Sequence, residues 1–264
     1  MTSLAGGRLR LDEPAPHVAR LTIDSPEKRN ALDHELLDAL AGSMCSLDAR
    51  CLIVTATGPV FSAGYDLGNL GPERLAERAE ALVAHPFHAA IEALDAYPYP
   101  AIAALNGHAI GGGLELALAC DMRVAAATAR LGMPPARLGL VYSHTGLRRF
   151  IEVIGPARTR ELFFTARNVT AQTAHAWGLV NEVVPVERLT DRAVEFAAGI
   201  AAMAPLSLSG NKRVIDELLA ARGALDPDVE AGLVALREAC FGTEDFSEGV
   251  RAFAEKRPPR WQGR

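Results

Sequence analysis

The sequence predicts an α/β fold in which strands and helices alternate and a purely helical region follows. Apolar, strand-like runs and helical patterns take turns over most of the chain, which is typical of layered α/β architectures. From about Leu189 onward only helical patterns remain. We therefore expect a core at residues 1–204, a boundary near Ala204 and Pro205, and a helical region at residues 205–264. A chain of 264 residues with 49% hydrophobic content can bury such a core.

The individual elements follow from local patterns. Strand-like runs cover residues 18–24, 51–56, 101–105, 123–127 and 179–184. Helical patterns are clearest over residues 33–47, 113–120 and 157–165, and Asp33 is a candidate N-cap of the first. In the C-terminal region, helical spacing predicts one buried stripe, formed by Val229, Leu233, Leu236 and Cys240.

Charge and composition exclude several classes of function. The formal net charge is −5 and both signs are interspersed, which argues against nucleic-acid binding. No run approaches the roughly 18 apolar residues of a membrane span, and residues 1–10 lack the apolar core of a signal peptide. We therefore expect a cytoplasmic protein without a membrane partner.

Cysteine and histidine patterns give no sign of a metal or disulfide framework. The seven histidines show no metal-ligand spacing, so we expect no metal site. The cysteines are scattered without a CxxC pair, and buried free thiols are expected at Cys45, Cys51, Cys120 and Cys240.

Two glycine-bearing loops carry most of the functional information. Residues 61–67 (FSAGYDL) follow one strand-like run, and residues 106–115 (NGHAIGGGLE) follow another. Glycine allows backbone N–H groups to approach a ligand closely, and the helix that opens near Gly113 adds its positive dipole end. One N–H from each loop would suit an oxygen that becomes negative during reaction, which is the outline of an oxyanion hole. Either loop alone would fit an ordinary turn equally well.

The helix after the second loop carries a single carboxylate, Glu115, among apolar residues. A lone charge on a helix that is apolar all round indicates a special role. The preference for acidic residues in the first turn of a helix offers a simpler explanation.

The chain resembles a known family over its whole length. Matching segments occur in the same order and spacing at residues 24–32 (DSPEKRNAL), in both glycine loops, and at residues 120–125, 174–184 and 253–258. These segments resemble the crotonase superfamily, also called the enoyl-CoA hydratase/isomerase family. The resemblance implies a core of repeated β-β-α turns, a C-terminal helical region that builds trimers or pairs of trimers, and acyl-CoA thioester substrates. Coenzyme A is then part of the substrate, and no tightly bound cofactor is expected.

The resemblance also assigns roles to individual residues. The N–H groups of Tyr65 and Gly112 match the two oxyanion donors. Arg29, beside Lys28, matches a position that approaches the CoA phosphates, and the backbone around Ala63 matches the segment that contacts adenine. An ordinary solvated basic pair would also explain Lys28 and Arg29.

Two further positions match residues that reach CoA across a subunit interface in the family. They are Phe253 and Lys256, which would fit a solvated tail helix equally well. Residues 67–86 match the segment that walls the acyl pocket, and their composition predicts a part-helical surface segment. His108, inside the second glycine loop, is interpreted as a loop-packing residue in preference to a base.

The chain departs from the two-glutamate pattern of hydratases. Glu115 matches the first glutamate, but the second normally follows Gly-x-Pro, and here Pro135 follows Gly132-Met133-Pro134. Proline cannot titrate. Residues 133–142 look most like the methylmalonyl-CoA decarboxylase branch, in which a tyrosine follows Leu-Gly, and Tyr142 matches that tyrosine. Tyr142 would fit a core aromatic with a satisfied hydroxyl about as well.

Three functional hypotheses remain open at this point. The leading one is an acyl-CoA lyase that decarboxylates a malonyl-type thioester through an enolate. The second is an enoyl-CoA isomerase or hydratase with Glu115 as its single acid and base. The third is a non-catalytic acyl-CoA-binding protein, against which a carboxylate in an apolar helix argues. A dinucleotide site is excluded because residues 107–113 lack GxGxxG spacing.

Overall fold

Two sheets organise the protein. The computed structural model describes residues 2–44, 47–65 and 86–264. The larger sheet has seven strands in the order β1-β2-β3-β4-β6-β8-β11, and the smaller has four in the order β10-β9-β7-β5. The strands are β1 Thr2–Leu4, β2 Leu9–Ala15, β3 Val18–Ile23, β4 Cys51–Ala56, β5 Val60–Ser62, β6 Ala101–Leu105, β7 His108–Ile110, β8 Met122–Ala126, β9 Arg130–Gly132, β10 Val169–Thr170 and β11 Glu182–Val184.

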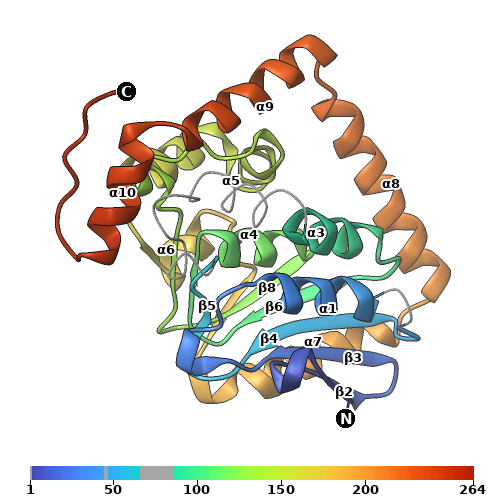
Figure 1. Ribbon diagram of the computed structural model, residues 1–264. Helices are drawn as coiled ribbons and strands as arrows, with labels where there is room; N and C mark the ends of the chain where they lie inside the picture. The colour runs from blue at the N-terminus through green and yellow to red at the C-terminus, as the bar shows by residue number, and fades with distance from the viewer. Residues whose placement is uncertain (1, 45–46, 66–85) are drawn as a thin grey trace.

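Helices cover the sheets and form the C-terminal region (Figure 1). They are α1 His34–Met44, α3 Pro86–Ala96, α4 Gly112–Ala119, α5 His144–Thr165, α6 Ala171–Ala176, α7 Leu189–Ala201, α8 Pro205–Gly223, α9 Pro227–Phe241 and α10 Glu244–Ala254, with 3-10 turns at Ala5–Gly7, Pro26–Lys28, Pro135–Leu138 and Val186–Arg188.

The core is a spiral of β-β-α repeats. The pairs β4 and β5, β6 and β7, and β8 and β9 each give their first strand to the large sheet and their second to the small one. Strands β3, β4, β6, β8 and β11 pair in parallel, so each turn of the spiral advances by one strand. This architecture confirms the fold that the sequence predicts.

The central strands are buried on both faces, which explains why they are continuous apolar runs in the sequence. In β4, Leu52 and Val54 belong to the main core beside α1, α3 and α4, while Cys51 and Ile53 pack toward α7. Helix α7 lies beneath the large sheet in Figure 1, opposite α1, α3 and α4. The carboxyl ends of the strands are thus free to carry loops.

Two of the helices predicted from the sequence can be compared with α1 and α5 of the structure. Asp33 caps α1, because its Oδ1 accepts a hydrogen bond of 3.0 Å from the N–H of Leu36. The helix expected at 157–165 is the second half of α5, which begins at His144 and is broken at Gly155, where φ is +72°. The Ser143 side chain caps its start by accepting from the N–H of Gly146. The first half of α5 was therefore missed.

The C-terminal region is helical as expected, but its apolar stripe is not buried within the chain. Val229 is 53% exposed, Leu233 37% and Leu236 57%, while Cys240 alone is buried. The expectation of one buried stripe was thus wrong for the single chain. Apolar spacing identifies a face that avoids water, and here nothing in the described chain covers most of it. Pro205 begins α8, and the division into residues 1–204 and 205–264 stays a prediction.

The remaining expectations concern thiols, membranes and metals. Cys51, Cys120 and Cys240 are free and buried, whereas Cys45 and residues 67–85 of the expected pocket wall lie outside the described residues. In the described part, no single helix is long and apolar enough to cross a bilayer. Residues 186–201 and 205–223 reach that length and hydropathy only when taken together, and they are bent by 100° at the break between them. The described residues also contain no cluster of three His, Cys, Asp or Glu side chains placed to hold a metal.

Candidate active site

The two glycine loops meet at the carboxyl ends of β5 and β7, which are joined through the small sheet. Gly64 has φ of +84°, a conformation that glycine adopts without strain. A Cβ added to Gly64 would lie 2.9 Å from the carbonyl oxygen of Ile110 and 3.2 Å from the nitrogen of Gly112. A side chain at 64 would therefore separate the loops that the sequence predicts to act together.

Each loop presents a backbone N–H at this contact. Gly112 is the first residue of α4, so its N–H has no acceptor within its own helix. Tyr65 forms an isolated parallel β-bridge with Leu32, in which the N–H of Leu32 donates to the carbonyl of Gly64. The N–H of Tyr65 is not used in this bond, and it has no hydrogen-bond acceptor among the described residues. The Tyr65 ring covers Gly112, where an added Cβ would come within 2.9 Å of it, and packs edge-on against Phe87.

Glu115 lies in the first turn of α4, next to these donors, and is 6% exposed. Its Oε2 accepts a hydrogen bond from the hydroxyl of Tyr142. Burial raises the pKa of the Glu115 carboxyl to about 7, while the bond from Tyr142 and the charge of Arg149 oppose the rise. Burial also raises the pKa of the Tyr142 phenol, and Glu115 adds to the effect, so the phenol keeps its proton at neutral pH.

The segment that carries Tyr142 is held by close packing. Pro135 starts a 3-10 turn and is buried, so the position of the usual second glutamate holds no titratable group. The Tyr142 ring packs edge-on against Phe163 at 5.4 Å between centroids. Gly146, in the first turn of α5, leaves room for the pair: an added Cβ would lie 2.6 Å from Oε1 of Glu115 and 2.7 Å from Cε1 of Tyr142.

Two arginines fix the helices around the pair, one partly buried and one buried. Arg149 on α5 pairs with both carboxylate oxygens of Asp95 on α3. Arg123 is buried and donates to the carbonyls of Cys120 and Leu179 at 2.8 and 2.7 Å, so a positive charge sits at the C-terminal end of α4. This arrangement complements the dipole of the helix whose N-terminus carries the candidate oxyanion donor.

Three residues expected at the CoA end lie together. The N–H of Ala63 donates to the carbonyl of Arg29 at 3.0 Å, and Lys28 ends the 3-10 turn just before Arg29. Asn30 holds this segment in place, because its buried amide accepts from the N–H of Ser25 and donates to the carbonyls of Thr57 and Val60. Asn30 was not singled out from the sequence, since asparagine in a charged stretch is usually solvated.

Phe253 and Lys256 lie apart from that group, at the end of α10. Phe253 is 62% exposed, and no described contact joins either residue to Lys28, Arg29 or Ala63. Their expected role requires a second subunit, so it stays a prediction. His108 is exposed and its Nδ1 accepts from the N–H of Arg130, which fits the loop-packing interpretation.

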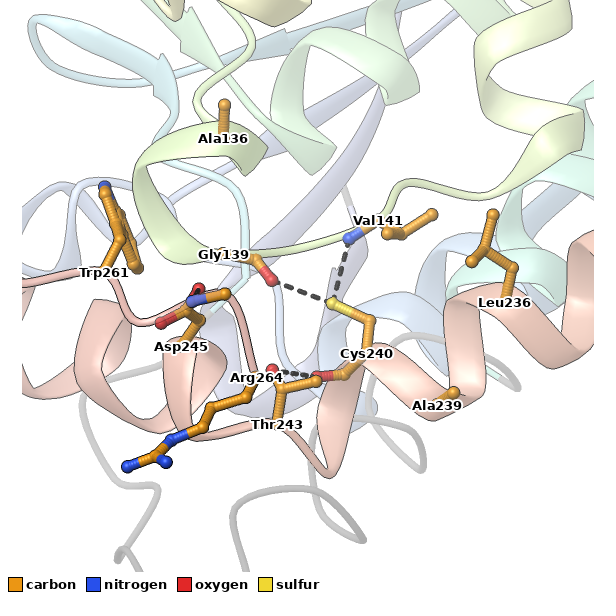
Figure 2. A pocket seen from close by; sticks show the side chains of 11 residues that line it. Ala136, Gly139, Val141, Leu236, Ala239, Cys240, Thr243, Asp245, Trp261 and Arg264 are labelled. Carbon is orange, nitrogen blue, oxygen red and sulfur yellow. Dashed lines mark hydrogen bonds between the residues drawn. The ribbon is translucent and has the colours of Figure 1, made fainter.

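Helices α9 and α10 pack against the segment before Tyr142. The Cys240 thiol accepts from the N–H of Val141 at 3.2 Å and donates to the carbonyl of Gly139 at 2.8 Å, as Figure 2 shows. An added Cβ on Gly249 would lie 2.5 Å from the carbonyl oxygen of Leu138, so α10 packs directly on the 3-10 turn. A cavity of about 470 Å³ remains between this segment, α9 and the C-terminal tail, and its lining includes Val141 and Leu236.

Comparisons with known proteins agree with this architecture. Residues 13–264 match the family model described as Enoyl-CoA hydratase/isomerase. The chain belongs to the enoyl-CoA hydratase/isomerase, or crotonase, family. It is 36% identical over 255 residues to YngF of Bacillus subtilis, whose name assigns it to the same family, with 94% of this chain and 95% of that one covered. It is 35% identical over 267 residues to the carnitinyl-CoA dehydratase of Salmonella arizonae, with 97% and 98% covered.

A solved structure of a crotonase-family relative is also similar along the whole chain. Methylmalonyl-CoA decarboxylase complexed with 2S-carboxypropyl-CoA superposes with a TM-score of 0.89 at 30% identity, covering 97% of this chain and 98% of the other. This protein is thus a crotonase-family acyl-CoA enzyme. Relatives in one family carry out different reactions, so the reaction must be argued from the site itself.

Several residues of the candidate site were not predicted from the sequence. Arg123, Arg149 and Gly146 each support the Glu115 and Tyr142 pair or its helices. Arginines that pack inside a protein look like surface residues in a sequence, and a glycine in a polar helix start looks like a loop residue. Only the packing of α3, α4 and α5 shows their positions.

Proposed function

We propose that this crotonase-family enzyme decarboxylates a malonyl-type CoA thioester, such as methylmalonyl-CoA. The observation that carries the proposal is the hydrogen bond from Tyr142 to Glu115, in a site where Pro135 replaces the second carboxylate. Hydration needs one group to activate water and another to manage the α-proton. Decarboxylation needs no base, and so it matches what this site contains.

The chemistry divides into two steps. The bond between the α-carbon and the substrate carboxylate breaks, CO₂ leaves, and the electron pair passes into the thioester to give an enolate. The N–H groups of Tyr65 and Gly112 hold the negative thioester oxygen, an interaction whose loss typically costs about 3 kcal/mol of barrier. A proton then goes to the α-carbon, so the overall reaction consumes one proton and releases the shortened acyl-CoA.

Tyr142 is the proposed proton donor in the second step, and Glu115 supplies it with a replacement proton. A carboxyl with a pKa of about 7 is partly protonated at neutral pH, and its Oε2 lies within hydrogen-bond reach of the Tyr142 hydroxyl. The protonated form of Glu115 also avoids repulsion of the substrate carboxylate. Both features support a pair that acts as one proton relay.

The CoA portion is assigned to Lys28, Arg29 and Ala63 of one subunit, with Phe253 and Lys256 contributed by another. The close contact between Ala63 and Arg29 supports the first group. The exposure of Phe253 supports the second, because a large apolar side chain at the end of α10 is free to meet a partner. Replacing Phe253 and Lys256 by alanine should weaken binding of free CoA several-fold, and unchanged affinity would refute their role.

The alternative is enoyl-CoA isomerisation or hydration with Glu115 as the only acid and base. One observation favours it: a pKa near 7 is well suited to a group that takes up and returns protons. A non-catalytic binding protein is a weaker proposal, because burying Glu115 beside the oxyanion donors is costly and brings no benefit to binding alone.

A substrate panel decides between these functions. The purified enzyme should release CO₂ from methylmalonyl-CoA or malonyl-CoA faster than it hydrates crotonyl-CoA or isomerises a 3-enoyl-CoA. Rapid loss of enoyl absorbance with inert malonyl thioesters would reverse the ranking. Absence of turnover with all four, despite CoA-thioester binding, would favour the binding protein.

A further inference from the structure

Helix α9 turns one face toward the segment that carries Tyr142. Near its start, Glu230 pairs with His144 at 3.2 Å, and near its end the Cys240 thiol contacts the N–H of Val141. Residues 230, 233, 237 and 240 lie on one side of a helix because of its 3.6-residue period. Arg237 therefore faces residues 141–144, between two contacts that fix the helix to them.

Among the residues that the structure describes, Arg237 has neither a hydrogen-bond nor an ion-pair partner. Its Nε is fully enclosed and, within the described residues, makes no hydrogen bond, and no described carboxylate forms an ion pair with its guanidinium. The nearest acid on the same helix face, Glu230, is already engaged with His144. An Nε–H that is shielded from water and has no acceptor is costly, because it loses its hydrogen bond to water without gaining another.

The charge of Arg237 affects the pKa of Tyr65, which lies at the acyl end of the site. Burial and Glu115 raise the pKa of the Tyr65 phenol, and Arg237 is the positive charge that opposes the rise. The Tyr65 ring in turn covers Gly112. By contrast, the charge that lowers the pKa of Glu115 belongs to Arg149. The two arginines thus affect different groups of the site.

We infer that Arg237 is the binding residue for a carboxylate on the acyl group of the substrate. A guanidinium accepts a carboxylate through two parallel hydrogen bonds, which would satisfy the enclosed Nε. This inference rests on the proposed function and sharpens it, because it gives the substrate carboxylate a cationic partner that offsets repulsion by an ionised Glu115. Pairing stabilises the bound carboxylate before reaction, so Arg237 contributes through affinity and orientation.

The test compares two unreactive ligands that differ only in the carboxylate. They are 2S-carboxypropyl-CoA and S-isobutyl-CoA, in which a methyl group replaces the carboxylate. Calorimetric titration of the full-length protein should show that Arg237→Met weakens the carboxylate ligand about 10- to 100-fold, the usual worth of a charge-assisted contact. Affinity for S-isobutyl-CoA should change less than about twofold, and Arg237→Lys should retain part of the carboxylate preference.

Arg213 provides a matched control, since it lies exposed on α8 and its replacement by methionine removes the same charge. Arg213→Met should affect neither ligand. Equal losses for both ligands in Arg237→Met would overturn the inference and point to the CoA phosphates, and no loss would overturn it outright. A structural role would lower the melting temperature of ligand-free Arg237→Met, whereas removal of an unpaired, partly buried charge should leave it equal or higher.

Failure of the Arg237 subsite can be distinguished from failure of the proposed decarboxylase function. If the wild-type enzyme releases no CO₂ from malonyl thioesters but its carboxylate preference depends on Arg237, the reaction is wrong and the subsite stands. If CO₂ is released and Arg237→Met keeps the full preference for the carboxylate ligand, the subsite is wrong and the reaction stands.

Discussion

The hydroxyl of Tyr142 donates to the carboxylate of Glu115, and the bond joins the first turn of α4, where Glu115 is buried, to the segment just before α5, where Tyr142 is partly buried. Tyr142 and Glu115 lie on different turns of the spiral, after β9 and after β7 respectively. The bond gives Glu115 a partner that is itself held by Phe163. Two side chains so coupled should be tested as a unit, because their effects on a proton transfer are not additive.

Conservative substitutions of this pair separate the two candidate reactions. If decarboxylation is the chemistry, Tyr142→Phe should lower kcat by about 10²- to 10⁴-fold, the range of a positioned proton donor. Glu115→Gln should cost less, because the amide still holds the phenol. Steady-state CO₂ release measures both. For isomerisation or hydration the order inverts, since Glu115 is then the group that moves the proton.

The pH profile should report the carboxyl of Glu115. Its pKa of about 7 lies above the ordinary value of 4.5, so the protonated form dominates below about pH 7. If that form supplies the proton, kcat/KM for decarboxylation falls as pH rises through about 7. The fall should vanish in Glu115→Gln. In Tyr142→Phe it should move to higher pH, because the bond from Tyr142 is what lowers the pKa.

The raised pKa of Glu115 also makes the free energy of unfolding depend on pH. Between about pH 4.5 and 7 the unfolded chain releases the Glu115 proton while the folded protein keeps it, so the free energy of unfolding falls as pH rises over this window. Relative to wild type, Glu115→Gln should gain stability on going from pH 5 to pH 8, by up to about 3 kcal/mol. Urea titrations at the two pH values measure the difference. An equal difference at both would contradict the raised pKa.

Gly146 should prove essential for the contact between Tyr142 and Glu115. A methyl group at 146 would lie 2.6 Å from Oε1 of Glu115, so Gly146→Ala must push the carboxylate or the phenol aside. We expect kcat to fall by at least about tenfold, because catalysis depends on the position of the proton donor. Gly199→Ala is the control, since an added Cβ there meets nothing within 4 Å, and it should leave kcat unchanged.

The sequence predicted the core well because buried parallel strands have a simple signature. The runs at 51–56 and 101–105 coincide with β4 and β6, since strands covered on both faces are continuously apolar. That the two glycine loops meet depends on pairing between β5 and β7, which no local pattern encodes. The oxyanion-hole hypothesis assumed that the loops meet, and the family resemblance, which carries long-range information, supported that assumption.

Other features escaped for identifiable reasons. Gly155 and Pro156 inside α5 are helix-breaking residues, so the pattern predicted only the half that follows them, and the cap at Ser143 was not recognised. Arg237 was not singled out from the sequence, because an arginine in a helix with charged neighbours gives no signal of an enclosed position. The exposed stripe on α9 shows the converse error, because periodicity marks an apolar face without showing what covers it.

That apolar face predicts self-association. On α8, Leu206 is 86% exposed and Leu218 61%, and α9 continues the apolar surface. Exposing so much apolar area is unfavourable, so we expect a trimer or a pair of trimers in solution. Sedimentation should show this mass at micromolar concentration, and Leu218→Glu should shift it toward the monomer, while Val186→Glu, at an exposed site outside these helices, should not. A monomeric wild-type protein would rule the assembly out.

The oxyanion hole itself is tested at Gly112. Gly112→Pro removes the N–H at the start of α4, a position at which proline is compatible with helix geometry, so loss of the donor can be separated from loss of the helix. The new ring would also press on Tyr65, because even a Cβ at 112 lies 2.9 Å from that ring. Gly112→Ala keeps the N–H and introduces the same crowding, which makes it the matched control. Decarboxylase activity should be abolished in Gly112→Pro and merely reduced in Gly112→Ala, with circular dichroism confirming that both fold. A folded Gly112→Pro protein with full activity would remove the basis for assigning the Tyr65 and Gly112 N–H groups to the enolate oxygen.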